Sequence, residues 1–257
     1  MSLFTQTVGH GPDVVLIHGW GMNGDVWEDV APLLAGSCRV TMVDLPGHGR
    51  SVDDLGDYSL EDLARQVVEA VPSGAILVGW SLGGMVATQI VLDNPGLMKG
   101  LVLVASAPQF VKDETWSEGM EAEVLDSFAG NLRDDYRNTV KRFIAIQSMG
   151  SDNPREEQRI IRDRVFRHGY PQIAALEGGL ALLHNTNLRP RLAEINCPTL
   201  LLAGVHDSLF RRSAAVRTQE LIKNAGIVVI QGAGHAPFLS HQKEFVTELK
   251  VFLNEHS

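Results

Sequence analysis

A serine flanked by glycines, in Gly79-Trp80-Ser81-Leu82-Gly83, could act as a nucleophile. The apolar run 75–78 before it predicts a buried strand, and residues 85–92 after it predict a helix. The two glycines allow a sharp turn between these elements, which would lift the Ser81 hydroxyl above a sheet and place it at a helix N-terminus. The alternative is a turn of a nucleotide-binding sheet in which Ser81 only caps the helix.

A serine hydroxyl needs a base to take its proton, and a carboxylate to orient that base. On a parallel sheet these partners follow later strands, in the order serine, acid, histidine. Asp207 follows the predicted strand 199–204, and His235 follows the predicted strand 227–230 in a glycine-rich loop that would leave the imidazole exposed. We therefore expect a catalytic triad of Ser81, Asp207 and His235. The competing residues are the acids Asp44 and Asp93 and the histidines His18, His48, His206 and His241.

Attack on a carbonyl group also requires two donors for the negative charge that develops on its oxygen. The backbone N–H of Leu82 lies at the predicted helix start, and that of Trp20 lies in the loop His18-Gly19-Trp20-Gly21. These two groups are the expected oxyanion hole. The Trp20 indole could line an acyl pocket or simply pack in the core.

The alternation of strands and helices predicts a mostly parallel sheet covered by helices on both faces. The pattern stops over residues 109–185, where charged amphipathic helices are expected and no convincing strand is found. We expect an α/β core of residues 1–108 and 186–257, with residues 109–185 as a helical lid over the carboxyl ends of the strands. The predicted strands are 3–7, 14–17, 40–43, 75–78, 101–105, 199–204 and 227–230, and helices are expected over 25–34, from Ser59 to before Pro72, and over 85–92, 213–222 and 243–253.

The composition is that of an ordinary globular protein, with 257 residues, 44% hydrophobic and 21% charged. A net charge of −9 argues against general nucleic-acid binding, and no apolar run reaches the roughly 18 residues of a membrane span. The N-terminus does not read as a signal peptide, and two cysteines cannot form a disulfide framework. We expect a cytoplasmic monomer with no nucleic-acid or membrane partner. No His-Glu-x-x-His is present, and we expect no metal and no cofactor.

With these residues in view, the chain resembles the α/β-hydrolase superfamily over its whole length. More narrowly, it resembles the pimeloyl-acyl-carrier-protein methyl ester carboxylesterases of biotin synthesis. The match in the predicted lid narrows the assignment most, because lids vary more between hydrolases than the serine turn does. The matching segments are His18-Gly19-Trp20-Gly21-Met22-Asn23, Val43-Asp44-Leu45-Pro46-Gly47-His48-Gly49-Arg50-Ser51, Gly79-Trp80-Ser81-Leu82-Gly83-Gly84, Thr139-Val140-Lys141-Arg142-Phe143, Gln147-Ser148-Met149-Gly150 and His235-Ala236-Pro237-Phe238.

The resemblance implies an α/β-hydrolase fold and a serine carboxylesterase that hydrolyses the methyl ester of pimeloyl-acyl-carrier protein and releases methanol. It implies that lid arginines hold the acidic carrier, of which Arg142, Arg155 and Arg159 stand at matching positions. One further family arginine is replaced by Asn138, and the adjacent Arg137 could serve instead. The implied substrate-binding residues are Trp20, Ser81, Leu82, Phe143, Gln147 and His235.

The charge pattern of the lid independently favours an acidic partner. Residues 133–167 carry nine basic and six acidic side chains, a net +3 in a chain of net −9. Arg155, Arg159 and Arg162 recur at i, i+4 and i+7, on one face of a predicted helix, which suits an acidic protein or a phosphate. The alternative is a solvated helix with internal pairs such as Glu156 with Arg159.

Other functions stay open at this point. A serine in the turn counts against dehalogenase or epoxide-hydrolase chemistry, which uses a carboxylate there. A broad-specificity short-acyl carboxylesterase and a serine C–C-bond hydrolase share the same triad. A ligand-binding receptor on the same fold and a metal hydrolase are the alternatives from other classes.

Overall fold

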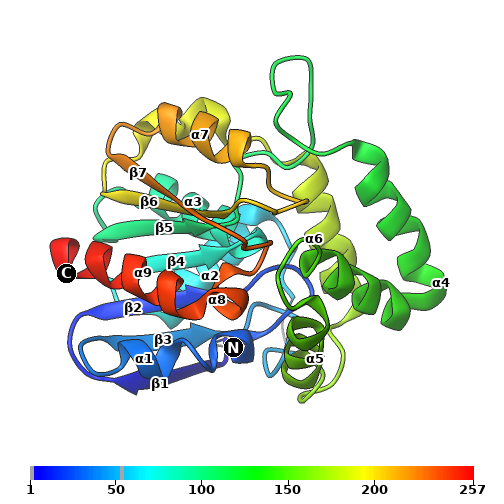
Figure 1. The fold of residues 1–257 in the computed structure, drawn as a ribbon, viewed down its shortest axis with the longest axis horizontal. Helices are drawn as coiled ribbons and strands as arrows, with labels where there is room; N and C mark the ends of the chain where they lie inside the picture. The colour runs from blue at the N-terminus through cyan, green and yellow to red at the C-terminus, as the bar shows by residue number, and fades with distance from the viewer. Residues whose placement is uncertain (1–2, 53–54) are drawn as a thin grey trace.

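Seven strands form a single sheet in the computed structural model, which describes residues 3–52 and 55–257 (Figure 1). The strand order is β1-β3-β2-β4-β5-β6-β7, with β1 antiparallel to β3 and the other neighbours parallel. The expected mostly parallel sheet is therefore confirmed. The strands are β1 (Thr5–Gly9), β2 (Asp13–Ile17), β3 (Arg39–Val43), β4 (Ile76–Trp80), β5 (Gly100–Val104), β6 (Thr199–Gly204) and β7 (Ala225–Ile230).

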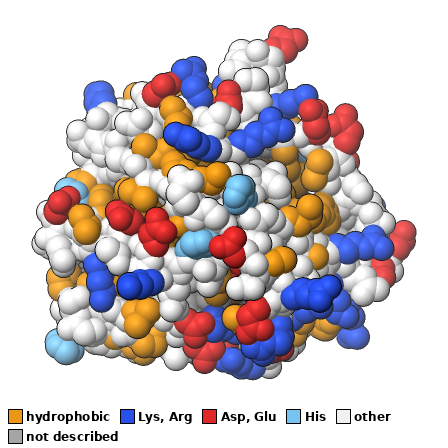
Figure 2. Space-filling model, in the orientation of Figure 1, with side chains coloured by type: hydrophobic (Ala, Val, Ile, Leu, Met, Phe, Trp, Pro, Cys, Tyr) orange, Lys and Arg blue, Asp and Glu red, His pale blue; other side chains and the backbone are white. Residues whose placement is uncertain are grey.

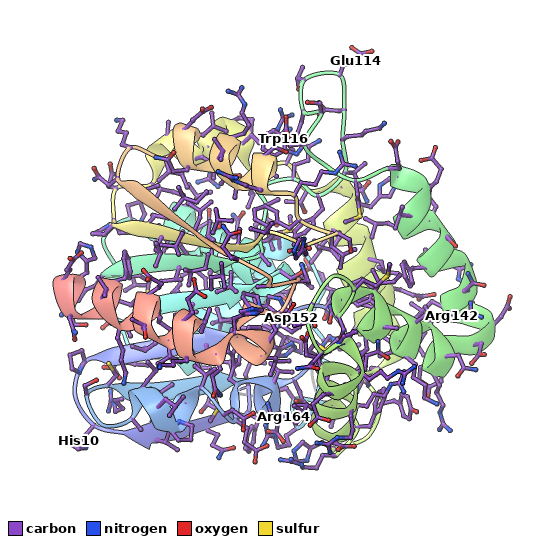
Figure 3. All side chains as sticks on the ribbon, in the orientation of Figure 1. His10, Glu114, Trp116, Arg142, Asp152 and Arg164 are labelled. Atoms are coloured by element: carbon purple, nitrogen blue, oxygen red, sulfur yellow. The ribbon has the colours of Figure 1, made fainter. Side chains whose placement is uncertain are left out.

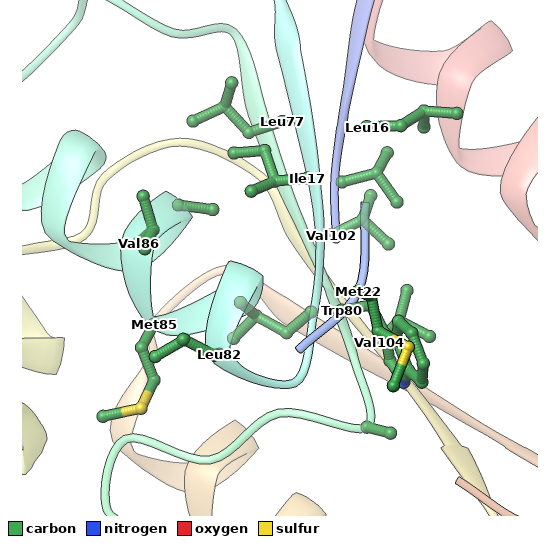
Figure 4. Close-up of a cluster of buried hydrophobic side chains, with 14 of the residues drawn as sticks. Leu16, Ile17, Met22, Leu77, Trp80, Leu82, Met85, Val86, Val102 and Val104 are labelled. Carbon is green, nitrogen blue, oxygen red and sulfur yellow. The ribbon is translucent and has the colours of Figure 1, made fainter. Parts of the chain in front are cut away.

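Helices cover both faces of the sheet, which explains why its central strands are apolar throughout. α2 and α3 pack against each other behind the sheet, and α1 and α9 lie on the opposite face (Figure 1). Figure 4 shows the core where β2, β4 and β5 meet α3, with Ile17, Val102 and Met85 among its side chains. The helices are η1 (Gly24–Trp27), α1 (Ala31–Leu34), α2 (Leu60–Ala70), α3 (Leu82–Asp93), α4 (Ala122–Gln147), α5 (Pro154–Val165), α6 (Ile173–Asn185), η2 (Arg189–Glu194), α7 (Arg212–Leu221), α8 (Pro237–Ser240) and α9 (Gln242–His256).

Local sequence signals account for several helix boundaries. Ser59 caps α2, since its hydroxyl accepts a hydrogen bond from the Asp62 N–H at 3.1 Å. The single helix expected over 25–34 is wrong, because η1 and α1 are two short pieces. Pro32 lacks the N–H that a continuous helix would need there, and α1 starts beside it.

Three helices, α4 to α6, lie between β5 and β6 in the sequence and stand beside the sheet (Figure 1). α4 breaks at Asp135, where the backbone is not helical, and the Asp135 carboxylate then accepts the Asn138 N–H at 3.3 Å to cap the second half. α5 is held to the core by Arg164, which pairs with Asp29 and donates to the Val26 carbonyl at 3.3 Å. The domain boundaries at 109 and 185 stay a prediction. Within the described ranges, we find no helix whose length and hydropathy would let it cross a bilayer.

Candidate active site

Ser81 occupies a strained turn between β4 and α3. Its φ of 54° and ψ of −119° are unusual for a residue other than glycine. The turn is fixed because the Ser81 N–H donates to the Val104 carbonyl at 2.9 Å and the Ser81 carbonyl accepts from the Ser106 hydroxyl at 2.7 Å. A Cβ at Gly79 would lie 2.4 Å from the Gly83 carbonyl oxygen, so the close approach of strand and helix requires glycine there.

His235 and Asp207 form a buried pair, in which Nδ1 and Oδ2 are 2.8 Å apart. The other carboxylate oxygen accepts the N–H groups of Leu209 at 2.8 Å and Phe210 at 2.9 Å. Because a carboxylate only accepts, this pairing keeps the imidazole proton on Nδ1 and leaves a lone pair on Nε2. The Nε2 atom is buried and has no hydrogen-bond partner among the described residues. The imidazole is thus oriented with its basic nitrogen unused.

The structure brings the three expected triad residues to one edge of the sheet. Ser81 follows β4, Asp207 follows β6 and His235 follows β7, each just past the carboxyl end of its strand. The expectation of an exposed imidazole is wrong, since His235 is 1% and Ser81 2% exposed. The end of α4 covers the histidine loop: the Gln147 carbonyl oxygen lies 3.5 Å from where a Cβ on Gly234 would stand. The glycines of that loop admit a close neighbour.

The competing acids are engaged elsewhere. Asp44 accepts the Gly24 N–H at 2.7 Å and pairs with Arg50 at 2.7 Å. Asp93 pairs with Arg191 at 3.1 Å. Among the described residues, no group of three or more His, Cys, Asp and Glu side chains is arranged to hold a metal ion.

The competing histidines also have other surroundings. His18 accepts the Leu45 N–H on Nε2 at 2.9 Å, and its Nδ1 lies 2.8 Å from the Gly19 carbonyl, so both ring nitrogens are occupied. Burial lowers the pKa of His18. Burial lowers the pKa of His48 to about 3, and the neighbouring His18 adds to the effect. His206 is exposed, and His241 is partly exposed.

The loop after β2 lies against the serine turn. A Cβ at Gly19 would stand 3.2 Å from Ser81 Cβ. Neither the Trp20 N–H nor the Leu82 N–H donates a hydrogen bond among the described residues. Both expected oxyanion donors are therefore available to an incoming oxygen atom.

Trp20, Leu82 and Phe143 come together where the inserted helices meet the core. The Trp20 and Phe143 rings make an edge-to-face contact with centroids 4.6 Å apart. The Trp20 indole N–H donates to the Leu176 carbonyl at 2.8 Å, and a Cβ at Gly179 would lie 2.5 Å from Trp20 and 3.3 Å from Leu82. α6 thus packs directly on the residues beside Ser81.

Gln147 stands out because both polar atoms of its buried side chain lack a hydrogen-bond partner among the described residues. An unsatisfied buried amide costs about 1–3 kcal/mol, so it calls for an explanation. Gln147 is the last residue of α4, next to the histidine loop. A ligand carrying polar groups would supply the missing partners.

The arginines of α4 and α5 differ in their partners. Arg159 pairs with Glu156 at 2.6 Å and with Asp163 at 3.1 Å, the internal pairing that was the alternative interpretation. Arg142, Arg155 and Arg162 are exposed and form no ion pair among the described residues. Figure 3 shows Arg142 on the outer side of α4 and Arg164 between α5 and the core. In Figure 2, basic and acidic side chains lie together over the region where α5 meets the core.

Residues 137 and 138 have local roles. The Asn138 side chain donates to the Asp135 carboxylate at 2.6 Å, and so stabilises the break in α4. The Arg137 guanidinium lies over the Tyr170 ring, 4.9 Å from its centroid. This cation–π contact still leaves Arg137 exposed.

Sequence reasoning missed Ser106, whose hydroxyl holds the Ser81 carbonyl. Ser106 follows β5 almost directly, and the rule that found Asp207 and His235 would have found it too. A serine at this place carries no motif of its own, so only its position after a parallel strand is informative.

The chain is similar to known proteins over nearly its whole length. Residues 14–248 match the Alpha/beta hydrolase family. The chain is 41% identical over 257 residues to the pimeloyl-[acyl-carrier protein] methyl ester esterase of Edwardsiella ictaluri, covering 100% of this chain and 99% of that protein. It is 43% identical over 253 residues to the protein of that name from Sodalis glossinidius, covering 98% of each.

Solved structures show the same fold at lower identity. A bromoperoxidase from Bacillus anthracis superposes with a TM-score of 0.89 at 24% identity, over 98% of this chain and 95% of that one. An esterase from Exiguobacterium antarcticum superposes with a TM-score of 0.88 at 22% identity, over the same shares. The family match over residues 14–248 and the full-length relatives show that the chain belongs to the alpha/beta hydrolase family.

Proposed function

We propose that this protein is a serine carboxylesterase. The observation that carries the proposal is the buried Asp207–His235 pair, whose Nε2 has no partner among the described residues, at the same edge of the sheet as the strained Ser81 turn. His235 takes the proton of Ser81 as its oxygen attacks the ester carbonyl, and Asp207 stabilises the resulting imidazolium. The alcohol leaves with that proton, and water then hydrolyses the acyl-enzyme by the same route.

The oxyanion formed in each step lies between the backbone N–H groups of Trp20 and Leu82. These amides have no other acceptor among the described residues, so no existing bond has to break before they donate. The loop carrying Trp20 is fixed by His18, which stays neutral because burial lowers its pKa. A pre-oriented donor of this kind is worth about 10²–10³ in rate.

The proposed substrate is the methyl ester of pimeloyl-acyl-carrier protein, with methanol as the released alcohol. The relatives at 41% and 43% identity carry that activity in their names and match the chain from end to end. Trp20, Leu82 and Phe143 offer apolar contacts for the acyl chain, and Gln147 offers the unpaired amide. We propose residues 109–185 as the lid that carries Phe143 and Gln147, over a core of 1–108 and 186–257.

The acidic carrier is proposed to bind the exposed arginines of the lid. Arg142, Arg155 and Arg162 have no intramolecular ion pair among the described residues, so binding a carrier carboxylate displaces no existing partner. Arg159 would have to exchange Glu156 or Asp163 for the carrier. Arg137, stacked on Tyr170, remains accessible and is proposed to take the place of the family arginine that Asn138 replaces.

The catalytic claim is tested by labelling with a fluorophosphonate, which reacts with activated serines. We expect labelling of the folded protein, its loss in Ser81→Ala, and its retention in the matched control Ser117→Ala, an exposed serine far along the chain. Failure to label the intact protein would favour the ligand-binding receptor. Hydrolysis that persists unchanged in Ser81→Ala would point to another nucleophile.

The substrate claim is tested by comparing kcat/KM for pimeloyl-carrier methyl ester with that for p-nitrophenyl butyrate. We expect a strong preference for the carrier ester that salt weakens, and a rise in its KM in a double variant Arg155→Glu, Arg162→Glu. The control is Lys243→Glu, Lys250→Glu on α9, which makes the same charge change on exposed residues away from the lid. Equal kcat/KM for both esters, insensitive to salt, would favour a broad-specificity esterase; cleavage of carbon–carbon bonds alone would favour the other hydrolase class.

Two further properties belong to the proposal. We propose a cytoplasmic protein that acts as a monomer, with the carrier as its macromolecular partner. Light scattering coupled to gel filtration measures the oligomeric state directly. A dimer that persists at low micromolar concentration would contradict the monomer.

A further inference from the structure

Trp80, the residue immediately before Ser81, makes a hydrogen bond to the loop that carries His235. Its indole N–H donates to the His235 backbone carbonyl at 2.8 Å, across 155 positions of sequence. The bond is buried, and Trp80 itself is fully buried. Among the described residues, this hydrogen bond links the loop of His235, the proposed base, to β4, the strand that precedes Ser81, through the single side chain of Trp80.

Aromatic packing holds the Trp80 ring in place. Phe238 contacts it edge-on, with centroids 4.9 Å apart, and the His235 ring lies at 5.8 Å. Figure 4 shows Trp80 beside Met22 and Val104, at the end of the sheet where Ser81 follows. The Phe238 ring also contacts the Trp27 ring, with centroids 4.1 Å apart. The indole N–H therefore points at the His235 carbonyl from a rigid frame.

The histidine loop needs such an anchor. Gly232, with φ of 75°, and Gly234 give it backbone freedom. The His206 N–H donates a hydrogen bond to the Ala233 carbonyl at 2.9 Å. The next backbone carbonyl along the loop that accepts a hydrogen bond among the described residues is that of His235, and its donor is the Trp80 indole N–H. On the imidazole itself, Asp207 holds Nδ1 and nothing among the described residues holds Nε2.

We propose that Trp80 is a positioning residue that fixes the distance between Ser81 and His235, a role that rests on the serine-hydrolase function proposed above. Because Trp80 and Ser81 are adjacent in the chain, its indole sets the base relative to the strand from which the nucleophile projects. Proton transfer from Ser81 depends steeply on that distance, since misplacing a group by about 1 Å can cost 10²-fold in rate. Loss of the N–H should therefore slow the chemical step more than substrate binding.

The test replaces the indole by a ring without an N–H. Trp80→Phe should lower kcat by about ten- to a hundredfold with KM changed less than about threefold, and should slow fluorophosphonate labelling by the same factor. Trp27→Phe is the matched control, because Trp27 is fully buried against the same Phe238 and its own N–H has no partner among the described residues. That variant should keep kcat. Thermal unfolding of both variants accounts for any loss of folded protein.

A second measurement serves if Trp80→Phe does not fold. In the wild-type protein labelled with ¹⁵N-tryptophan, reaction of Ser81 with the fluorophosphonate should shift the Trp80 indole signal and leave the Trp27 signal in place. Equal kcat in Trp80→Phe and Trp27→Phe, or an unshifted Trp80 signal, would overturn the positioning role alone. Wild-type hydrolysis by Ser81→Ala would overturn the proposed function and this role with it.

Discussion

Glu157 is a buried carboxyl on the inner face of α5, and its replacement by Gln gives a sharp test of the structure. The side chain is 3% exposed, and neither oxygen has a hydrogen-bond partner of good geometry among the described residues. Burial raises the pKa of Glu157 to about 7; the Ser151 hydroxyl opposes the rise, and the Asp152 charge adds to it. The carboxyl is therefore neutral in mildly acidic solution and ionises near pH 7.

The sign of the effect on stability follows from proton linkage. The folded protein holds this proton up to about pH 7, whereas the unfolded chain loses it near 4.5. The stabilising contribution is thus complete below pH 4.5 and is lost as pH rises through 7. At roughly 1.4 kcal/mol per pKa unit, a rise from 4.5 to about 7 corresponds to a loss of about 3 kcal/mol at alkaline pH.

Urea unfolding of the wild type and of Glu157→Gln, at pH 5 and pH 8.5, measures this contribution. The variant cannot ionise at this position, so its advantage in free energy of unfolding should grow by about 2–3 kcal/mol between the two pH values. Glu156→Gln is the control, because Glu156 is exposed on the same helix and pairs with Arg159, which lowers its pKa. A difference between wild type and Glu157→Gln that is the same at both pH values would refute the reasoning.

Three further predictions concern contacts around the proposed site. Ser106→Ala removes the hydroxyl that holds the Ser81 carbonyl at 2.7 Å, and should cost about 1–2 kcal/mol in stability and lower kcat in steady-state assays; an unchanged kcat would count against this contact. Gly179→Ala places a methyl group 2.5 Å from Trp20, so kcat/KM should fall for carrier and small esters alike, and a fall for only one would contradict it. Arg164→Ala breaks a bridge from the buried Arg164 to the exposed Asp29, together with the bond to the Val26 carbonyl, and should destabilise the protein by about 1–2 kcal/mol in denaturant unfolding, whereas Arg155→Ala should change stability by less than about 0.5 kcal/mol.

Much of the site could be predicted because its residues follow a rule of topology. The carboxyl ends of parallel strands meet at one edge of the sheet, so polar residues placed just after strands come together. Ser81, Asp207 and His235 each satisfy this condition, and their strands are marked by unbroken apolar runs. The predicted strand 199–204 has the same bounds as β6 in the structure. Its pairing register with β7 could be determined only from the structure.

The burial of His235 could not be read from its neighbours in the sequence. Glycines in the loop indicate that its backbone can turn sharply, but they do not indicate which residues cover the loop. The covering groups are Gln147, 88 positions earlier, and Trp80, 155 positions earlier. The sequence did not predict α8 for a related reason. Its four residues form a single turn that packs through Phe238 against Trp80 and Trp27, and these contacts are not visible in the local sequence pattern.

The net charge of residues 133–167 does not by itself define the surface open to an acidic partner. At about 100° per residue, Arg162 lies about 20° from Arg155 around α5, whereas Arg164 lies about 180° away. The arginines of α5 therefore lie on two faces. Arg164 is buried and pairs with Asp29, whereas Arg155 and Arg162 are exposed and form no ion pair among the described residues. The net +3 of residues 133–167 counts the inward Arg164 and, with the opposite sign, the buried Glu157, so the sum alone does not say where the exposed charge lies. The positive surface open to an acidic partner is localised on outward arginines such as Arg155 and Arg162. This localisation is why reversal of two outward arginines should suffice to separate carrier binding from ester hydrolysis.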